Sequence, residues 1–153
     1  MFKTVSPSDI VALWDMVGGP MPRGVLGLGD PDVHIIDGIP TMFLGGFSTS
    51  FRNRLYTATL TPGADPATAA WRITLDTRGR ARSLTADPPR DGWDAEGMHT
   101  PSYVPPIGDQ PARIYYTGRM SKKQYGPRSS YAIGALELIE GNWVRRGDPL
   151  ITG

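Results

Sequence analysis

The chain has 153 residues and a formal charge of +1, with 16 lysines and arginines against 15 aspartates and glutamates. This length is enough for one domain with its own core, and the balanced charge argues against a nucleic-acid partner. The absence of cysteine excludes disulfides, thiolate metal sites and cysteine nucleophiles. The 19 glycines and 15 prolines favour short strands and many turns over long helices.

Residues 1–24 are expected to form a lead-in with one short helix. The stretch SPSD at 6–9 offers a hydroxyl N-cap, a proline at the first helical position and a nearby carboxylate. Apolar residues then recur at helical spacing until Gly18-Gly19-Pro20 ends the helix. The chain shows no signal-peptide pattern and no apolar run of roughly 18 residues, so we expect a soluble, cytoplasmic protein without a membrane partner.

The rest of the sequence is expected to form short strands in two groups, residues 25–86 and 93–153. Asp37-Gly38 is a hairpin signal in the first group, and residues 87–92, DPPRDG, are expected to link the groups. The strands expected from the sequence are 33–36, 41–47, 55–60, 71–75 and 81–85, then 102–104, 112–117, 131–138 and 143–146.

The two groups repeat one another. TMFLGG at 41–46 matches RIYYTG at 113–118, and both this match and the pair Trp71 and Trp143 are separated by 72 positions. The repeating units have four short strands each, from 33–36 to 71–75 and from 102–104 to 143–146, with 81–85 as a further strand. Two such units, each closing on a tryptophan strand, are typical of propeller blades. The predicted fold is therefore all-β, a partial β-propeller of about two blades in a single domain with a short N-terminal helix.

The repeat slips by two residues near an Asp-Pro motif. Pro31 and Pro101 are separated by 70 positions rather than 72, a difference that a turn between strands can absorb.

Three stretches resemble the five-bladed β-propeller glycosidases of families 43, 32, 62 and 68. They are DPDV at 30–33 with its turn at 37–38, WDAEGMHTPSYV at 93–104 followed by ARIYYTG, and SYAIGA at 130–135 followed by WVRRGDPL at 143–150. The likeness spans Gly29 to Leu150. It implies a sugar or sugar-like small molecule as the ligand, no cofactor, and a carboxylate near the propeller axis.

By this resemblance Asp30 is the candidate general base or nucleophile, and Pro31 is expected to hold it in an extended conformation. Glu96 and His99, expected just before the first strand of the second blade, are the candidate acids. The alternatives are an Asp-Pro turn that only opens a strand and a loop histidine that caps a turn. Glycoside hydrolysis needs two carboxylates flanking one bond, and the family takes further ones from later blades that have no counterpart here.

Four further residues are candidates for binding the ligand. Arg52 and Arg54 could hold an anionic or hydroxyl-rich group, or could lie on an exposed hairpin tip. Trp93 and Tyr116 could stack on a sugar, or could belong to the core. The two histidines and the scattered carboxylates make no recognisable ligand spacing, so no metal site is expected.

Two blades alone would leave an apolar face and a strand edge at each end. Copies of the chain arranged around an axis would cover these faces, with a homotrimer slightly favoured over a homodimer. Three functions remain open: a glycosidase-like enzyme whose site is completed by oligomerisation, a non-catalytic carbohydrate or small-ligand binding module, and a structural subunit that pairs with a second polypeptide.

Overall fold

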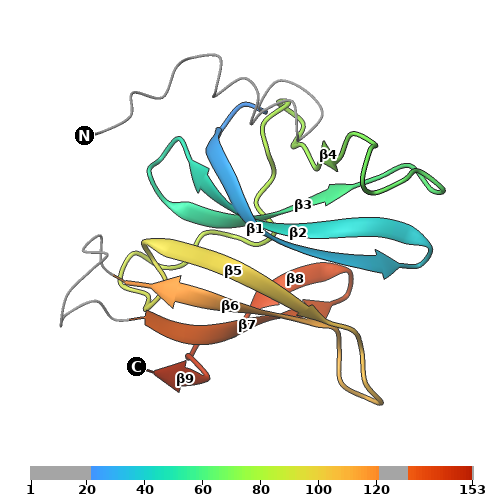
Figure 1. Cartoon of the computed structure of the whole chain (residues 1–153). Helices are drawn as coiled ribbons and strands as arrows, with labels where there is room; N and C mark the ends of the chain where they lie inside the picture. Colours follow the sequence, from blue (N-terminus) through green and yellow to red (C-terminus); the bar gives the residue numbers. More distant parts are fainter. Residues whose placement is uncertain (1–21, 121–130, 153) are drawn as a thin grey trace, which may run out of the picture.

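The computed structural model describes residues 22–120 and 131–152, and its secondary structure there is entirely β (Figure 1). The helix predicted near the N-terminus lies outside these residues. Within the described part of the chain, no helix has the length and apolar character needed to span a membrane. The strands are β1 (Val25–Ile36), β2 (Ile39–Ser48), β3 (Asn53–Thr59), β4 (Arg72–Ile73), β5 (Gly97–Val104), β6 (Arg113–Arg119), β7 (Tyr131–Ile139), β8 (Asn142–Arg145) and β9 (Ile151–Thr152).

The strands form two antiparallel meanders, β1-β2-β3-β4 and β5-β6-β7-β8, with β9 pairing β7 beside β8. One parallel pair, Asn53 with Gly97, connects β3 to β5. Figure 1 shows the first meander (blue to green) stacked above the second (yellow to red). The sheet is open, as in part of a propeller, and the predicted fold class is confirmed.

The internal repeat is visible in the strand registers. Leu28 pairs with Gly46 in the first meander, and Met98 pairs with Gly118 in the second. The slip of two residues lies in the connection between the first two strands of each unit. Asp37-Gly38 joins β1 to β2, whereas residues 105–112 join β5 to β6.

Several expected strands differ from the structure. β5 begins at Gly97 rather than at residue 102, β4 is Arg72–Ile73 rather than 71–75, and β9 was not expected. The first strand begins at Val25 rather than near residue 33, because its glycine-rich start, VLGLG, is accommodated in an antiparallel ladder. Residues 81–85 are not a strand and contribute one isolated bridge, Leu75 with Ala81. The Asp76 carboxylate accepts hydrogen bonds from the backbone N–H groups of Arg78 and Arg80, which holds the chain in a turn instead of a ladder.

Side chains on the two faces of β2 and β3 pack into two separate hydrophobic cores. Phe43 and Leu55 face the second meander and pack with its buried side chains, whereas Leu44 and Tyr56 face the other way. That outer core is closed by the segment around Trp71, with Leu60, Ala64, Ala69 and Ala81. Each large side chain buried in these clusters contributes about 1.5–3 kcal/mol to folding. Together they fix how the two meanders lie on one another.

Candidate functional site

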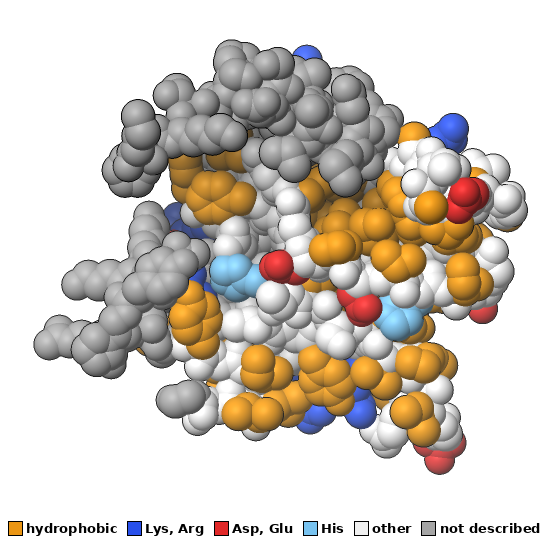
Figure 2. Space-filling model, viewed as in Figure 1, with side chains coloured by type: hydrophobic (Ala, Val, Ile, Leu, Met, Phe, Trp, Pro, Cys, Tyr) orange, Lys and Arg blue, Asp and Glu red, His pale blue; other side chains and the backbone are white. Residues whose placement is uncertain are grey.

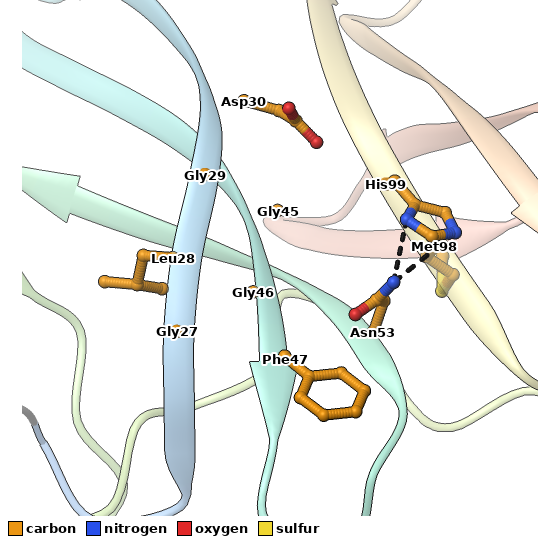
Figure 3. Close-up of a pocket in the computed structure, with 10 residues that line it drawn as sticks. All are labelled: Gly27, Leu28, Gly29, Asp30, Gly45, Gly46, Phe47, Asn53, Met98 and His99. Atoms are coloured by element: carbon orange, nitrogen blue, oxygen red, sulfur yellow. Dashed lines mark hydrogen bonds between the residues drawn. The ribbon is translucent and has the colours of Figure 1, made fainter. Parts of the chain in front are cut away.

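A pocket opens between the first strands of the two meanders, β1 and β5 (Figure 3). It has a volume of about 220 Å³. Figure 3 shows the Asp30 carboxylate pointing from β1 toward β5, with the His99 ring on the facing strand. We call this opening the Asp30 pocket; its lining is Gly27, Leu28, Gly29, Asp30, Gly45, Gly46, Phe47, Asn53, Met98 and His99.

Asp30 owes its position to a β-bulge. The register moves from Gly29 opposite Gly45 to Asp32 opposite Phe43, so that an extra residue of β1 is pushed out of the ladder. The φ of Asp30 is 51°, in the left-handed region and not the extended conformation expected before a proline. The prediction for the backbone was therefore wrong: the bulge, rather than the proline, determines how this exposed carboxylate is presented.

The second meander carries the same bulge. Its register shifts between His99 and Ser102, and Thr100, which precedes Pro101, has a φ of 46°. Thr100 thus occupies the place that Asp30 has in the first meander, and its backbone N–H lies 3.4 Å from Asp30 Oδ2. His99 lies within β5 rather than before it, one residue ahead of the position that corresponds to Asp30.

Asn53 orients the His99 ring. The Asn53 side-chain amide lies 2.8 Å from His99 Nδ1, and the ring lies back over Gly97, where an added Cβ would be 2.8 Å from Nε2. Because the amide N–H donates to Nδ1, the neutral ring carries its proton on Nε2. Burial lowers the pKa of His99, as does the positive charge of Arg119, while Asp30 acts in the opposite direction.

We expect the His99 ring to titrate at a lower pH than an ordinary histidine, whose pKa is about 6.5. Asp30→Asn should lower the His99 pKa further, because it removes a charge that favours the imidazolium. Since the pKa is depressed on folding, the contribution of this ring to stability is present above about pH 6.5 and is lost as the pH falls. NMR titration of the ring protons, assigned with His34→Gln, measures both effects. A higher His99 pKa in Asp30→Asn would contradict the placement of the Asp30 carboxylate beside this ring.

Glu96 does not line the Asp30 pocket. It precedes β5 in a turn, and its backbone N–H donates to the carbonyl oxygen of Arg119 at 2.9 Å. Its Oε2 atom is buried and has no hydrogen-bond partner among the residues that the structure describes. Of the two predicted acids, His99 is therefore the one that lines the pocket with Asp30.

The two candidate arginines lie away from the Asp30 pocket. Arg52 is half-buried in the connection between β2 and β3, where its carbonyl oxygen accepts a hydrogen bond from Ser48. Arg54 is 3% exposed, so it is not on an exposed tip, and its Nε donates to Asp87 Oδ1 at 2.6 Å. It faces the side of β3 opposite to Asn53.

Trp93 and Tyr116 belong to a packed cluster outside the Asp30 pocket. Their rings stack with centroids 5.6 Å apart, and Tyr116 is 1% exposed. The Tyr116 hydroxyl donates to Asp94 at 2.6 Å, and Trp93 Nε1 donates to the carbonyl oxygen of Gly147 at 2.9 Å. Tyr116 is therefore core, and Trp93 is partly buried and packs against that core with its polar atom bound to the chain itself.

A second aspartate–histidine pair lies on the same face of the molecule. Asp32 Oδ1 is 2.9 Å from His34 Nε2, and Asp32 Oδ2 accepts a hydrogen bond of 2.6 Å from the backbone N–H of Tyr103. Figure 2 shows both histidines (pale blue) on this face, each beside a carboxylate (red). Asp32 ties β1 to β5 and so holds the wall of the Asp30 pocket in place.

Sequence reasoning missed several residues that line the Asp30 pocket. Asn53 and Phe47 gave no signal, whereas Gly45-Gly46 inside an expected strand could have indicated a close approach. A Cβ added to Gly45 would lie 3.3 Å from Asp30 Oδ2, so glycine leaves room for the carboxylate. Across the described residues, no group of three or more histidine, aspartate or glutamate side chains is placed to hold a metal ion.

No protein-family model and no curated protein sequence matches the chain. Solved structures do match it in fold. One is from the GH130 family of mannoside phosphorylases, which contains glycoside hydrolases that target β-1,2 mannosidic linkages in Candida mannan. It aligns with a TM-score of 0.56 and 20% identity, over 83% of this chain and 37% of its own. A second, the BT0996 RGII complex, aligns with a TM-score of 0.52 and 12% identity, over 97% of this chain and 46% of its own.

The chain therefore spans less than half the length of both neighbours. At these identities the likeness establishes the fold alone, and it does not place the chain in family 43, 32, 62 or 68. The described residues form a partial, propeller-like β fold that is similar to part of these solved structures.

Proposed function

We propose that the chain is a glycosidase-like propeller protein that acts on a sugar or sugar-like small molecule in the Asp30 pocket. The supporting observation is that Asp30 and His99, from the first strands of two successive meanders, line one opening. Such groups suit the hydroxyls of a sugar, and Phe47 adds an apolar wall for its C–H face. In this proposal Asp30 is the general base.

His99 is the acid partner of Asp30 in the proposed reaction. Its lowered pKa leaves the ring neutral near pH 7, so it can donate its second proton only at lower pH. Turnover should therefore rise as the solution is made mildly acidic and the His99 ring takes up its second proton.

A non-catalytic binding module is the second candidate. It is favoured by the number of carboxylates, because among the described residues Asp30 is the one carboxylate that lines the pocket, whereas glycoside hydrolysis uses two.

For the enzymatic function, a neighbouring copy of the chain is the proposed source of the second carboxylate. Light scattering on a sizing column would test the predicted homotrimer or homodimer, and a stable monomer would contradict it.

Asp30→Asn is expected to reduce turnover by roughly 10²–10⁴-fold while the fold remains intact, because an amide cannot accept the proton. The assay would use a panel of glycosides that includes β-1,2-linked mannosides, with binding measured by calorimetry on the same panel. Asp37→Asn, an exposed aspartate in the β1–β2 turn, is the matched control.

Equal turnover in Asp30→Asn and Asp37→Asn would contradict the catalytic role. Saturable binding without product would select the binding module. No binding by any member of the panel would contradict both.

A further inference from the structure

The opposite face of β3 lines a second cavity. Asn53 and Arg54 are consecutive on this strand, so their side chains leave the sheet on opposite faces. Asn53 reaches the Asp30 pocket, whereas Arg54 lines a separate cavity of about 310 Å³. The cationic and hydroxyl-bearing residues that matter here are Arg54, Arg78, Arg80, Ser48, Ser50 and Tyr56.

Arg54 is a buried cation with an unused donor. It is 3% exposed, its Nε donates to Asp87 Oδ1, and its Nη1 donates to the carbonyl oxygen of Asn53 at 2.8 Å. Its Nη2 is buried and has no partner in the part of the chain that the structure describes. A buried donor without an acceptor is unfavourable and uncommon in native proteins. Such a group is explained if an acceptor arrives with a ligand.

The carboxylates of this cavity are already engaged. Asp76 accepts two backbone N–H bonds of 2.9 Å, from Arg78 and Arg80, and the Arg80 bond is the main reason that its pKa is lowered. Asp87 receives the Nε bond of Arg54. The cavity lining thus holds three arginines and two aspartates, and both aspartates accept hydrogen bonds from other residues of the chain. The balance of charge favours an anion.

Neutral donors complete the lining. The hydroxyls of Ser48 and Ser50 lie 2.7 Å apart. Burial raises the pKa of Tyr56, so its phenol stays protonated and can donate. Gly24 has a φ of 95°, and a Cβ there would lie 3.4 Å from Arg80 Nε, so glycine allows this side chain to lie against the start of β1.

We propose that this cavity binds a small oxyanion of the phosphate type, either free or carried by a small molecule. Guanidinium groups match the oxygens of such an anion in charge and geometry, and hydroxyl donors satisfy the remaining oxygens. Nη2 of Arg54 would gain its missing acceptor. The site is separated from the Asp30 pocket by β3 and does not rest on the proposed sugar chemistry.

The test is calorimetric titration with inorganic phosphate at constant ionic strength, with chloride as the balancing anion. Saturable binding is expected in the full chain, and Arg80→Gln should weaken it about tenfold through the loss of a charge-assisted contact. Arg80 is exposed, so this variant should fold, as circular dichroism would verify. The matched control is Arg82→Gln, an exposed arginine two residues away that does not line the cavity.

A second titration, with glucose 6-phosphate against glucose, distinguishes a free from a carried phosphate. Tighter binding of the sugar phosphate than of phosphate, lost in Arg80→Gln but kept in Asp30→Asn, would identify a phosphorylated small molecule. Equal losses in Arg80→Gln and Arg82→Gln would overturn the proposal, as would no binding of either phosphate compound. Failure here leaves the assays on Asp30 unaffected, so the two proposals can be judged separately.

Discussion

Asp94→Ala is expected to lower the free energy of unfolding by about 3–5 kcal/mol, because it leaves a half-buried guanidinium without its partner. Asp94 is fully buried, at 0% exposed. Its carboxylate accepts two hydrogen bonds of 2.6 Å from Arg145 and a third, also of 2.6 Å, from the Tyr116 hydroxyl. Urea unfolding would measure the loss. The control is Asp91→Ala, an exposed aspartate nearby, for which a change within about 0.5 kcal/mol is expected.

The first meander has apolar side chains at two places that the second meander fills with Tyr116 and Arg145, the partners of Asp94. At the repeat distance of 72, Leu44 corresponds to Tyr116, and Ile73 corresponds to Arg145. One blade therefore fills this place with apolar side chains and the other with an ion pair. Replacing a buried ion pair by apolar groups is often neutral, whereas removing one partner is not.

The double variant Asp94→Ala with Arg145→Met should therefore recover part of the stability lost in Asp94→Ala. A double-mutant cycle measures the coupling between the two residues. If the losses of the two single variants simply added, the proposed pairing would be contradicted.

The fold was predictable because it depends on patterns that a sequence displays. The repeated spacing of Trp71 and Trp143 and the hairpin signal at Asp37-Gly38 indicated two successive units of antiparallel strands, and the structure has both units. The expected strand at 81–85 is absent, and β9 was not predicted. The two-residue slip at Pro31 and Pro101 was also visible, and the structure places it in the connection that differs between the meanders.

The site was only partly predictable, because side-chain direction depends on register. Arg54 and Asn53 are adjacent on β3, so their side chains point to opposite faces of the sheet. Which of them faces the Asp30 pocket is decided by the pairing of β3 with β2, and the sequence does not give this register. Tyr116 is equally plausible as a sugar platform or as core until its neighbour Asp94 is placed. The left-handed φ of Asp30 came from a bulge, which a sequence with an ordinary Asp-Pro dipeptide does not display.

Gly118→Ala is expected to cost more than the 1–3 kcal/mol typical of overpacking, because the Trp93 ring and the Asp94 side chain fill the space above this glycine. A Cβ at Gly118 would collide with Trp93 Cζ3 and would lie 2.8 Å from Asp94 Cβ. Trp93 is held by its hydrogen bond to the Gly147 carbonyl oxygen and by its stacking on Tyr116. Urea unfolding followed by tryptophan fluorescence would measure the loss.

Two further variants make this prediction specific. Gly147→Ala is the control, since nothing lies within 4 Å of a Cβ there, and its stability should be close to that of the parent. Adding Trp93→Phe to Gly118→Ala should restore part of the stability, because the smaller ring frees the space. The corresponding glycine in the first meander, Gly46, is confined in the same way by Tyr56 and Leu28. A Gly118→Ala protein as stable as its parent would mean that Trp93 does not cover β6. Close packing would then not explain why both meanders have a glycine at this position.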